Sequence, residues 1–479
     1  MLPSHATYLR LIRDSLEGNI LPAVRSDYAR MLAEVSSGLL ARMLVEENEL
    51  PELRRAALAS YRVLLPDLKR LLNPASYADF EQASGGASPY AWPAFDSAAR
   101  DIVRRLLDLG STAAGCAGKL IAIDFSLREQ VEAAYKAESA AGSVPESQIE
   151  TFDGQQLQHL RDWLMQRFPA ECNLSITGVK RLAGGNSKVT MLIQLGGTCE
   201  LPASLVMRCE KRVSSTASSI TTEFPLLTAL HDLGVPVPRP YLLESTGQIV
   251  GMPFLLMEHL SGRIIGDFVQ VKEPSPEVAL DYARALARLH KAPVDRLSKY
   301  LNEGEVPVLQ RVRGEIEIYE QDWKALRKSA FVMDCAYDWL KANLHLAEGH
   351  RAVVHRDVGA HNMLVDHNRV MALLDWERST TGNPAEDLGC IYYMVGQMTD
   401  WETFIARYEQ VAGFYIPEVQ IDFYTLWGSV RLVTMIAKAN VPILEGRLKH
   451  LQLAFAGEHY VQQLLHRVSG KLTRILEGA

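Results

Sequence analysis

Apolar residues recur every three or four positions through the first part of the chain, which is the pattern of amphipathic helices. These apolar stripes occupy residues 28–43, 53–68 and 99–107, and a further one begins at Leu127. The pattern therefore predicts an all-helical N-terminal domain over residues 1–140.

The character of the chain changes after a small, polar, proline-containing stretch at residues 141–150, which is typical of a linker. Beyond it the apolar pattern predicts three strands, at residues 176–182, 189–195 and 203–208. Later, two short apolar runs flank the polar turn DHNR and predict a hairpin at residues 363–374. We expect an α+β region in two parts, with a sheet in residues 151–260 and mostly helices in residues 261–479.

The predicted hairpin carries the most informative polar residues of the chain. Asp357 and Asn362 precede it, five positions apart in the segment HRDVGAHN, and Asp375 directly follows its second strand. Phosphoryl transfer from ATP requires a carboxylate that accepts a hydroxyl proton and oxygen ligands for Mg²⁺. The joint spacing favours Asp357 as the catalytic base and Asn362 and Asp375 as metal ligands. The alternative, two ordinary turn carboxylates, would suit an isolated HRD sequence.

A second candidate site is the turn between the first two predicted strands. Its residues are Gly184, Gly185, Asn186, Ser187 and Lys188. The backbone N–H groups of such a turn can face an anion, and Ser187 or Lys188 can add to them, so the turn is a candidate to cover phosphates. The same residues would also suit an ordinary hairpin turn. A Walker A sequence and G-x-G-x-x-G are both absent.

Composition limits the other functions that need to be considered. The 479 residues allow two or three domains, and the net charge of −7 comes without the clustered basic face of a nucleic-acid-binding protein. The six cysteines are scattered, which predicts reduced thiols. No apolar run approaches the roughly 18 residues that span a bilayer, and the N-terminus lacks a secretory apolar core. We expect a cytoplasmic protein with no membrane and no nucleic-acid partner.

The sequence from His355 to Leu388 resembles the signature of the aminoglycoside phosphotransferase-like kinases, a group that includes choline kinase-like enzymes. It is most similar to the phosphotransferase domains associated with acyl-CoA dehydrogenases, in which the second carboxylate sits in DWE and a G-x-P-x-x-D-L tail follows, here from Gly382 to Leu388. The resemblance covers about residues 150–440. It implies a two-lobed protein-kinase-like fold, with an antiparallel sheet in the small lobe and a large helical lobe.

The resemblance also implies roles for residues outside the hairpin. Arg208 ends the third predicted strand, where kinase-like folds carry a phosphate-gripping Lys; Lys211 is the other candidate for that role. Glu223 stands where the family has the helical carboxylate that pairs with this cation. His355 would orient the catalytic loop, and Asp387 would hold the loop's backbone. An adenine edge would meet backbone groups at an interlobe hinge, formed by Met257, Glu258, His259 and Leu260.

These features together predict an ATP- and Mg²⁺-dependent phosphotransferase that acts on the hydroxyl of a small molecule, with a hydroxyacyl-CoA favoured as the acceptor. Three alternatives stay open: an aminoglycoside- or macrolide-type antibiotic kinase, a protein kinase, and a catalytically silent nucleotide-binding module. The lack of an A-P-E element argues against a protein kinase. The N-terminal helices bring no carboxylates, His or Cys together. They form either a module for a protein partner or self-association, or helices that simply pack.

Overall fold

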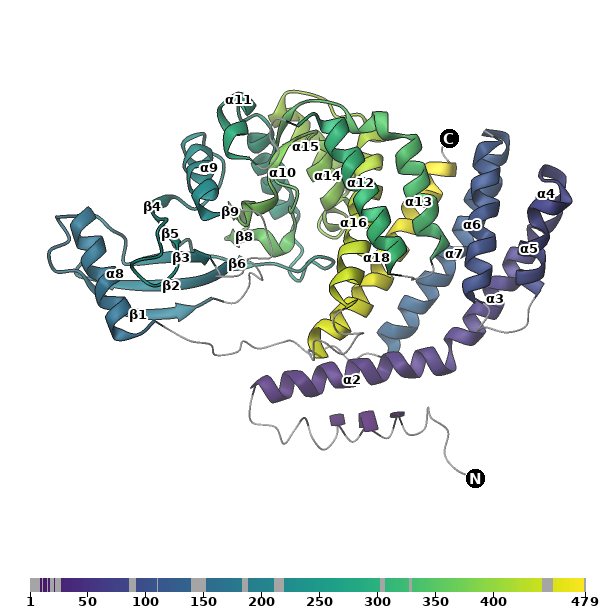
Figure 1. The fold of residues 1–479 in the computed structure, drawn as a ribbon, viewed down its shortest axis with the longest axis horizontal. Coiled ribbons are helices and arrows are strands. Elements are labelled where there is room, and N and C mark those ends of the chain that lie inside the picture. The colour runs from purple at the N-terminus through teal and green to yellow at the C-terminus, as the bar shows by residue number, and fades with distance from the viewer. Residues whose placement is uncertain are drawn as a thin grey trace. The chain divides into compact units, whose positions relative to one another are not determined.

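The computed structural model describes residues 27–85, 92–109, 111–138, 152–182, 188–210, 219–301, 306–326, 330–441 and 451–477, together with a few positions before residue 27. By their contacts the residues fall into two compact units (Figure 1). The helical unit comprises residues 1–146, 309–346 and 422–479. The mixed unit comprises residues 147–308 and 347–421.

The described part of the helical unit is built from helices. The helices are α2 (Asp27–Asn48), α3 (Leu50–Val63), α4 (Leu65–Leu71), α5 (Pro74–Gly85), α6 (Trp92–Asp108), α7 (Ser111–Glu138), α12 (Val308–Ala325), α13 (Phe331–Ala342), α16 (Glu418–Ala439) and α18 (Leu451–Glu477). Helix α7 contacts α2, α3, α6 and α18. A Cβ at Gly470 would lie 2.7 Å from the Phe125 ring, so α18 needs a glycine there to approach α7.

Two of the predicted N-terminal helices differ from the observed ones. The stripe at residues 53–68 is divided between α3 and α4, because Pro66 lacks the N–H that would continue the first helix. The helix expected to begin at Leu127 instead begins at Ser111. Its first turns bury small residues such as Ala113 and Ala117, which give a weak apolar signal in the sequence. The linker predicted at residues 141–150 lies outside the described residues.

The N-terminal helices also pack against a segment far along the chain. Arg104 of α6 and Asp338 of α13 form an ion pair of 2.6 Å, although 234 residues separate them in the sequence. The neighbouring pair, Arg100 and Asp334, lies 3.4 Å apart. The helical unit therefore includes helices inserted into the second half of the chain as well as the N-terminal ones.

A five-stranded antiparallel sheet with the order β1-β2-β3-β5-β4 begins the mixed unit. The strands are β1 (Ser175–Arg181), β2 (Lys188–Gly196), β3 (Ser204–Glu210), β4 (Pro240–Glu244) and β5 (Phe254–Glu258). In the β2–β3 register, Thr190 lies opposite Arg208, and Lys188 lies opposite Glu210. Because paired residues share a face of the sheet, Lys188 and Arg208 project from the same face.

The two faces of this sheet have different neighbours. Met207 and Cys209 belong to a core cluster with Trp163 of α8 (Gly154–Arg167), a helix that begins with a capping box at Asp153. The opposite face carries Val206, which packs with Ile220 of α9 (Ile220–Asp232). Helix α9 is therefore placed on the face from which Lys188 and Arg208 project.

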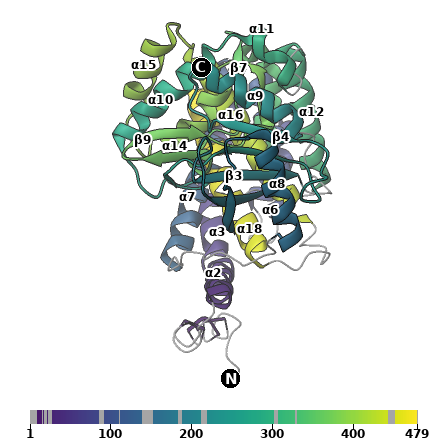
Figure 2. The same cartoon turned by 90° about the vertical axis from the view of Figure 1, so that its left-hand side faces the viewer.

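The rest of the mixed unit combines short strands with helices. It contains β6 (Arg263–Ile264), α10 (Pro276–His290), α11 (Val294–Leu297), β7 (Ala352–Val354), β8 (Met363–Asp366), β9 (Arg369–Leu373), β10 (Thr380–Gly382), α14 (Ala385–Val395) and α15 (Trp401–Ala412). Helices α10 and α15 lie side by side (Figures 1 and 2). Ser275 caps α10, as its position before Pro276 predicts.

The predicted hairpin is present as β8 and β9. Its two central turn residues, His367 and Asn368, have φ angles of 46° and 58°, as a type I′ turn requires. Helix α9 begins at Ile220 because Ser219 caps it, and Pro225 lies in its second turn. The antiparallel sheet and the largely helical second part agree with the predicted α+β class. Within the described ranges, no helix combines the length and apolar character needed to cross a bilayer.

Candidate active site

Asp357, Asn362 and Asp375 are connected by short contacts along the hairpin segment. The side-chain nitrogen of Asn362 donates to Oδ2 and to the backbone carbonyl of Asp357, at 3.0 Å in both cases. The Asn362 carbonyl accepts the N–H of Leu374, the residue before Asp375, at 2.9 Å. The three predicted side chains are thus carried on one hydrogen-bonded segment, and both carboxylates keep about a quarter of their side-chain surface exposed, at 28% for Asp357 and 24% for Asp375.

The backbone before Asp357 is held by a buried carboxylate. Asp387 of α14 accepts hydrogen bonds from the N–H groups of His355 and Arg356, at 2.8 and 2.7 Å. It also lies 3.0 Å from Nε2 of His290, whose other ring nitrogen is 2.7 Å from the Tyr408 hydroxyl. All of these groups are buried, so the carboxylate fixes the path of the chain just ahead of Asp357.

His355 connects the two halves of the segment. Its Nδ1 accepts the N–H of Asp357 at 3.3 Å, so Nε2 carries the ring proton and donates to the Leu374 carbonyl at 2.9 Å. The ring also packs on Trp376, with 4.5 Å between ring centroids. The His355 ring therefore ties the residue before Asp375 to the chain around Asp357.

Two residues of this segment adopt a left-handed backbone conformation. Arg356 and Asp375 both have a φ of 66°, although neither is glycine. Such conformations cost roughly 1–3 kcal/mol each and persist where the surrounding contacts hold them, most often at functional sites. Here the contacts include the bonds to Asp387 and a 2.6 Å ion pair between Arg356 and Glu386.

Asp357 remains a carboxylate because of its neighbours. Burial alone would raise its pKa, but His361, His355 and Arg378 outweigh this and hold the pKa of Asp357 below its usual value. Nε2 of His361 lies 3.5 Å from Oδ1 of Asp357. A Cβ at Gly359 would come within 2.8 Å of the His361 ring, so this position needs glycine for the imidazole to lie beside the carboxylate.

A buried carboxylate joins two cations on the sheet face described above. Glu223 of α9 contacts Nζ of Lys188 and Nη1 of Arg208, each at 2.6 Å. Arg208 also reaches Oδ1 of Asp375 at 3.2 Å. Glu210 accepts the N–H of Ile220 at 2.7 Å and so fixes the start of the helix that carries Glu223. We call Lys188, Glu223, Arg208 and Asp375 the charge cluster.

The cluster keeps Glu223 ionised in a buried position. Burial would raise the pKa of Glu223, but the charges of Arg208 and Lys188 hold it below the ordinary glutamate value. Lys188 and Glu223 are almost fully buried, with 2% and 1% of their side-chain surfaces exposed, whereas Asp375 is 24% exposed. The charge cluster therefore has a buried end, at Lys188 and Glu223, and a partly exposed end, at the Asp375 carboxylate.

Sequence and structure place Lys188 differently. The sequence puts it in a phosphate-covering turn, but the structure places it at the start of β2, buried and paired with Glu223. The other residues of that turn, 184–187, and the alternative cation, Lys211, lie outside the described residues. The predicted pairing of Arg208 with Glu223 is present at 2.6 Å.

The residues of the predicted hinge lie at the end of β5. The Glu258 N–H donates to the Arg239 carbonyl at 2.8 Å, and Met257 is buried within the sheet. The ring nitrogen Nδ1 of His259 is 2.9 Å from the Ser204 hydroxyl. His259 and Leu260 follow the last residue of the strand, where the backbone leaves the sheet.

The polar groups suit a magnesium ion that is shared with phosphate. Among the described residues, no three His, Cys, Asp or Glu side chains gather as a self-sufficient metal site. Asn362 and Asp375 offer an amide oxygen and a carboxylate, and the amide oxygen makes no hydrogen bond to the described residues. Mg²⁺ prefers hard oxygen ligands and usually takes one or two protein carboxylates together with phosphate oxygens. These residues therefore fit the predicted ion.

Sequence reasoning missed several contacts that support the site. His290, at the end of α10, bridges Asp387 and Tyr408. The pairing of Lys188 with Glu223 was also missed. These contacts join segments 97, 118 and 35 residues apart, so no local pattern in the sequence signals them.

Comparison with known families agrees with this geometry. Residues 178–422 match the family described as the phosphotransferase enzyme family, and this match covers 245 of the 479 residues. The chain belongs to the phosphotransferase enzyme family. All of the described residues assigned above to the candidate active site lie within the matched segment.

Curated relatives of this chain carry acyl-CoA dehydrogenase names. The rat protein named acyl-CoA dehydrogenase family member 11 is 29% identical over 245 residues, which are 48% of this chain and 30% of the relative. The Arabidopsis thaliana protein named probable acyl-CoA dehydrogenase IBR3 is 30% identical over 241 residues, or 47% and 29% of the two chains. The matched segment thus spans less than a third of these relatives.

A solved structure confirms the fold. It comes from Ralstonia eutropha and is assigned to the aminoglycoside phosphotransferases; the TM-score is 0.54 at 22% identity, over 68% of this chain and 99% of that one. At this level of identity the likeness concerns the fold alone. The predicted kinase-like architecture is confirmed.

Proposed function

We propose that the protein is an ATP- and Mg²⁺-dependent phosphotransferase that transfers the γ-phosphoryl group to a hydroxyl of a small molecule. The observation that carries the proposal is the hydrogen-bonded segment that holds Asp357, Asn362 and Asp375 next to the Arg208–Glu223 pair. Membership of the phosphotransferase family supports the same reaction class.

Asp357 would act on the acceptor. Its lowered pKa keeps it ionised at neutral pH, so it can orient the acceptor hydroxyl and take its proton. Asn362 and Asp375 would hold the magnesium ion, which supplies charge neutralisation of the phosphates when it is bound. His355 and Asp387 would act as positioning residues through the backbone of the segment.

Arg208 would neutralise the nucleotide phosphates. It already contacts Asp375, and Glu223 fixes one edge of its guanidinium, which leaves a planar donor group at the partly exposed end of the cluster. Lys188 would hold Glu223 from the other side. We also propose that the turn at residues 184–187 covers the phosphates and that the backbone after Glu258 receives the adenine edge.

We propose a hydroxyacyl-CoA as the acceptor. The support is the similarity to segments of proteins named as acyl-CoA dehydrogenases. An antibiotic acceptor is the alternative that the aminoglycoside phosphotransferase-like fold supports.

The test is turnover of the full-length protein with Mg²⁺ and ATP on a panel of hydroxylated compounds. The panel contains hydroxyacyl-CoA esters, aminoglycosides, macrolides, choline and a generic protein substrate. We expect phosphorylation of a small molecule, strongest with a CoA ester and lost in Asp357→Asn. Transfer to an antibiotic would reject the proposed acceptor but keep the reaction class. Failure with every small molecule, or turnover that survives Asp357→Asn, would reject the function itself.

A further inference from the structure

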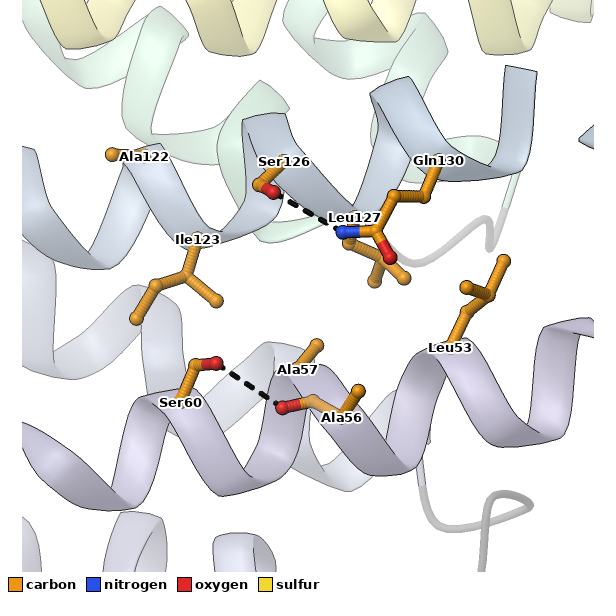
Figure 3. Close-up of a pocket in the computed structure, with 9 residues that line it drawn as sticks. All are labelled: Leu53, Ala56, Ala57, Ser60, Ala122, Ile123, Ser126, Leu127 and Gln130. Carbon is orange, nitrogen blue, oxygen red and sulfur yellow. Dashed lines mark hydrogen bonds between the residues drawn. The ribbon is translucent and has the colours of Figure 1, made fainter. Parts of the chain in front are cut away.

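Two cavities in the helical unit differ in whether the polar groups of their walls already have hydrogen-bond partners. One lies between α3 and α7 and has a volume of about 260 Å³ (Figure 3). Its polar groups are satisfied within their own helices: the Ser60 hydroxyl donates to the Ala56 carbonyl, and the Gln130 amide donates to the Ser126 hydroxyl, each at 3.2 Å. These hydroxyl and amide groups therefore do not need a polar ligand.

The second cavity, which we call the arginine cavity, is larger and charged. It has a volume of about 420 Å³, within the range of roughly 300–1,000 Å³ that small-molecule sites occupy. Helices α2, α3, α6, α7 and α18 all contribute to its wall. The charged residues in the wall are Arg42, Arg54, Arg128 and Glu46. The wall thus carries an excess of positive charge in a chain whose net charge is −7.

Two of the three arginines are fixed by protein partners. Arg128 forms two hydrogen bonds of 2.7 and 3.0 Å with the buried carboxylate of Asp124, which also accepts a hydrogen bond from Ser469. Arg42 donates to Glu46 at 2.9 Å and lies over the ring of Tyr135. These contacts hold both guanidinium groups in fixed positions at the cavity wall.

Arg54 has no such carboxylate partner. Its guanidinium lies over the Trp92 ring, 5.3 Å from the centroid, and makes no hydrogen bond or ion pair with the residues that the structure describes. Burial lowers the pKa of Arg54, and the like charge of Arg128 adds to this effect against the attraction of Asp96 and Glu46. A half-buried guanidinium in this position is stabilised by an anion that accepts hydrogen bonds from two of its coplanar N–H groups.

Part of the remaining wall is apolar, and Tyr135 and Gln462 also line the cavity. Leu127 and Val131 of α7 and Leu465 of α18 are buried residues that also line the cavity. A ligand there would meet both arginine and aliphatic side chains.

We propose that the arginine cavity binds a small organic oxyanion, a phosphate or carboxylate joined to an apolar group. The oxyanion accepts hydrogen bonds from Arg54 and from the Arg128 nitrogens not used by Asp124. The apolar group packs on Leu127, Val131 and Leu465. This site is separate from the charge cluster, and its ligand need not take part in phosphoryl transfer.

The test is calorimetric titration of the full-length protein with phenyl phosphate, benzoate, inorganic phosphate and neutral benzyl alcohol at constant ionic strength. We expect phenyl phosphate or benzoate to bind, and their ratio identifies the preferred oxyanion. Benzyl alcohol should not bind, and inorganic phosphate should bind more weakly because it lacks the apolar group. Absence of binding by both aromatic anions would overturn the proposal. Inorganic phosphate binding as tightly as phenyl phosphate would overturn the role of the apolar wall.

The matched variants are Arg54→Met and Arg55→Met. Arg55 is the next residue of α3, is exposed, and pairs with Glu52 at 2.6 Å. Arg54→Met should weaken anion binding by about tenfold or more, whereas Arg55→Met should not change it. Equal binding by the two variants would overturn the site.

Two further variants keep the result interpretable. Arg54→Lys retains the charge without the planar fork, so it should fold and bind with intermediate affinity even if Arg54→Met is unstable. Arg208→Met should bind phenyl phosphate like the wild type; loss of binding there would place the anion at the charge cluster and contradict the proposal.

Discussion

Arg208 and Arg356 of the mixed unit are held differently from Arg54 of the helical unit. In the mixed unit, Arg208 and Arg356 each reach a buried glutamate at 2.6 Å, and Arg208 continues to Asp375. In the helical unit, Arg54 lies on an indole ring with no carboxylate at hydrogen-bond distance among the described residues. The difference teaches that the mixed unit completes its charge pairs within the protein, whereas the arginine cavity leaves positive charge for a ligand.

This contrast predicts that some charged residues matter mainly for stability and others mainly for ligand binding. A buried charge in a complete network is costly to leave alone, since removing its partner strands it in the interior. A cation that lacks a protein partner contributes little to stability, and its loss is felt only when a ligand is present. Substitutions in the two units should therefore differ in which measurement they change.

The largest effect is expected for Asp357→Asn in the mixed unit. Loss of the group that accepts the hydroxyl proton should lower kcat by about 10²–10⁴-fold. The fold should persist, because Asn can keep a hydrogen bond to Asn362. Asp366→Asn is the control and should keep kcat; it changes a carboxylate of the same hairpin that accepts a hydrogen bond from Ser261. Similar activity in the two variants would contradict the role of Asp357.

Glu223→Gln should cause the greatest loss of stability. It leaves Lys188 and Arg208 without their shared counter-charge, at a cost of about 3–5 kcal/mol in the free energy of unfolding. Chemical denaturation measures this value. Glu273→Gln, at an exposed ion pair with Arg263, should leave the denaturation midpoint unchanged.

The same variant gives a pH test. Because the folded pKa of Glu223 is lowered, its stabilisation is fully present above the unfolded value of about 4.3 and is lost as the pH falls through the lower folded pKa. The stability gap between the wild type and Glu223→Gln should therefore narrow below about pH 4.3. A gap that widened with acidification would contradict the charge cluster.

Arg208→Met and Lys188→Met should distinguish the roles of the two cations that share Glu223. Arg208 alone extends to Asp375, so its loss should weaken Mg·ATP binding by about tenfold or more. Lys188 is 2% exposed and contacts Glu223, so its loss should lower stability by about 1–3 kcal/mol with a smaller effect on nucleotide affinity. Equal effects on affinity would show that both cations reach the nucleotide.

His361→Gln should shift a pH profile rather than remove activity. His361 helps to lower the pKa of Asp357, so its loss should raise that pKa and move the acidic limb of kcat/KM to higher pH. The measurement is kcat/KM as a function of pH in the acidic range. An unchanged limb would show that Asp357 does not determine it.

The smallest effect on stability is expected for Arg54→Met in the helical unit. Burial disfavours the charged Arg54, so its replacement should change the free energy of unfolding by less than about 1 kcal/mol in the absence of ligand. Calorimetry without added anions checks this. A loss as large as that for Glu223→Gln would mean that Arg54 has a partner within the protein, and the contrast between the units would fail.

The sequence predicts what depends on local spacing. The hairpin, the cap at Ser275, and the segment that carries Asp357, Asn362 and Asp375 each lie within a short stretch, so pattern and chemistry appear together. The resemblance to a kinase family added predicted roles for Arg208 and Glu223. The fold class followed from the same patterns.

What the sequence could not predict depends on contacts between distant segments. Lys188 was placed in a turn because its neighbours are Gly, Asn and Ser, but pairing with β3 puts it at the start of a strand, facing Glu223. The arginine cavity assembles Arg42, Arg54 and Arg128 from three helices, and each looks like an ordinary surface arginine in its own helix. Tertiary packing, rather than local pattern, gives these residues their environment.

The central claim is that Asp357, Asn362 and Asp375 surround one magnesium nucleotide. Calorimetric titration of ATP with and without Mg²⁺, in the wild type, Asp357→Asn and Asp375→Asn, tests it most directly. The account predicts Mg²⁺-dependent ATP binding that persists in Asp357→Asn and is strongly weakened in Asp375→Asn. Binding that is independent of Mg²⁺, or equal in all three proteins, would contradict it.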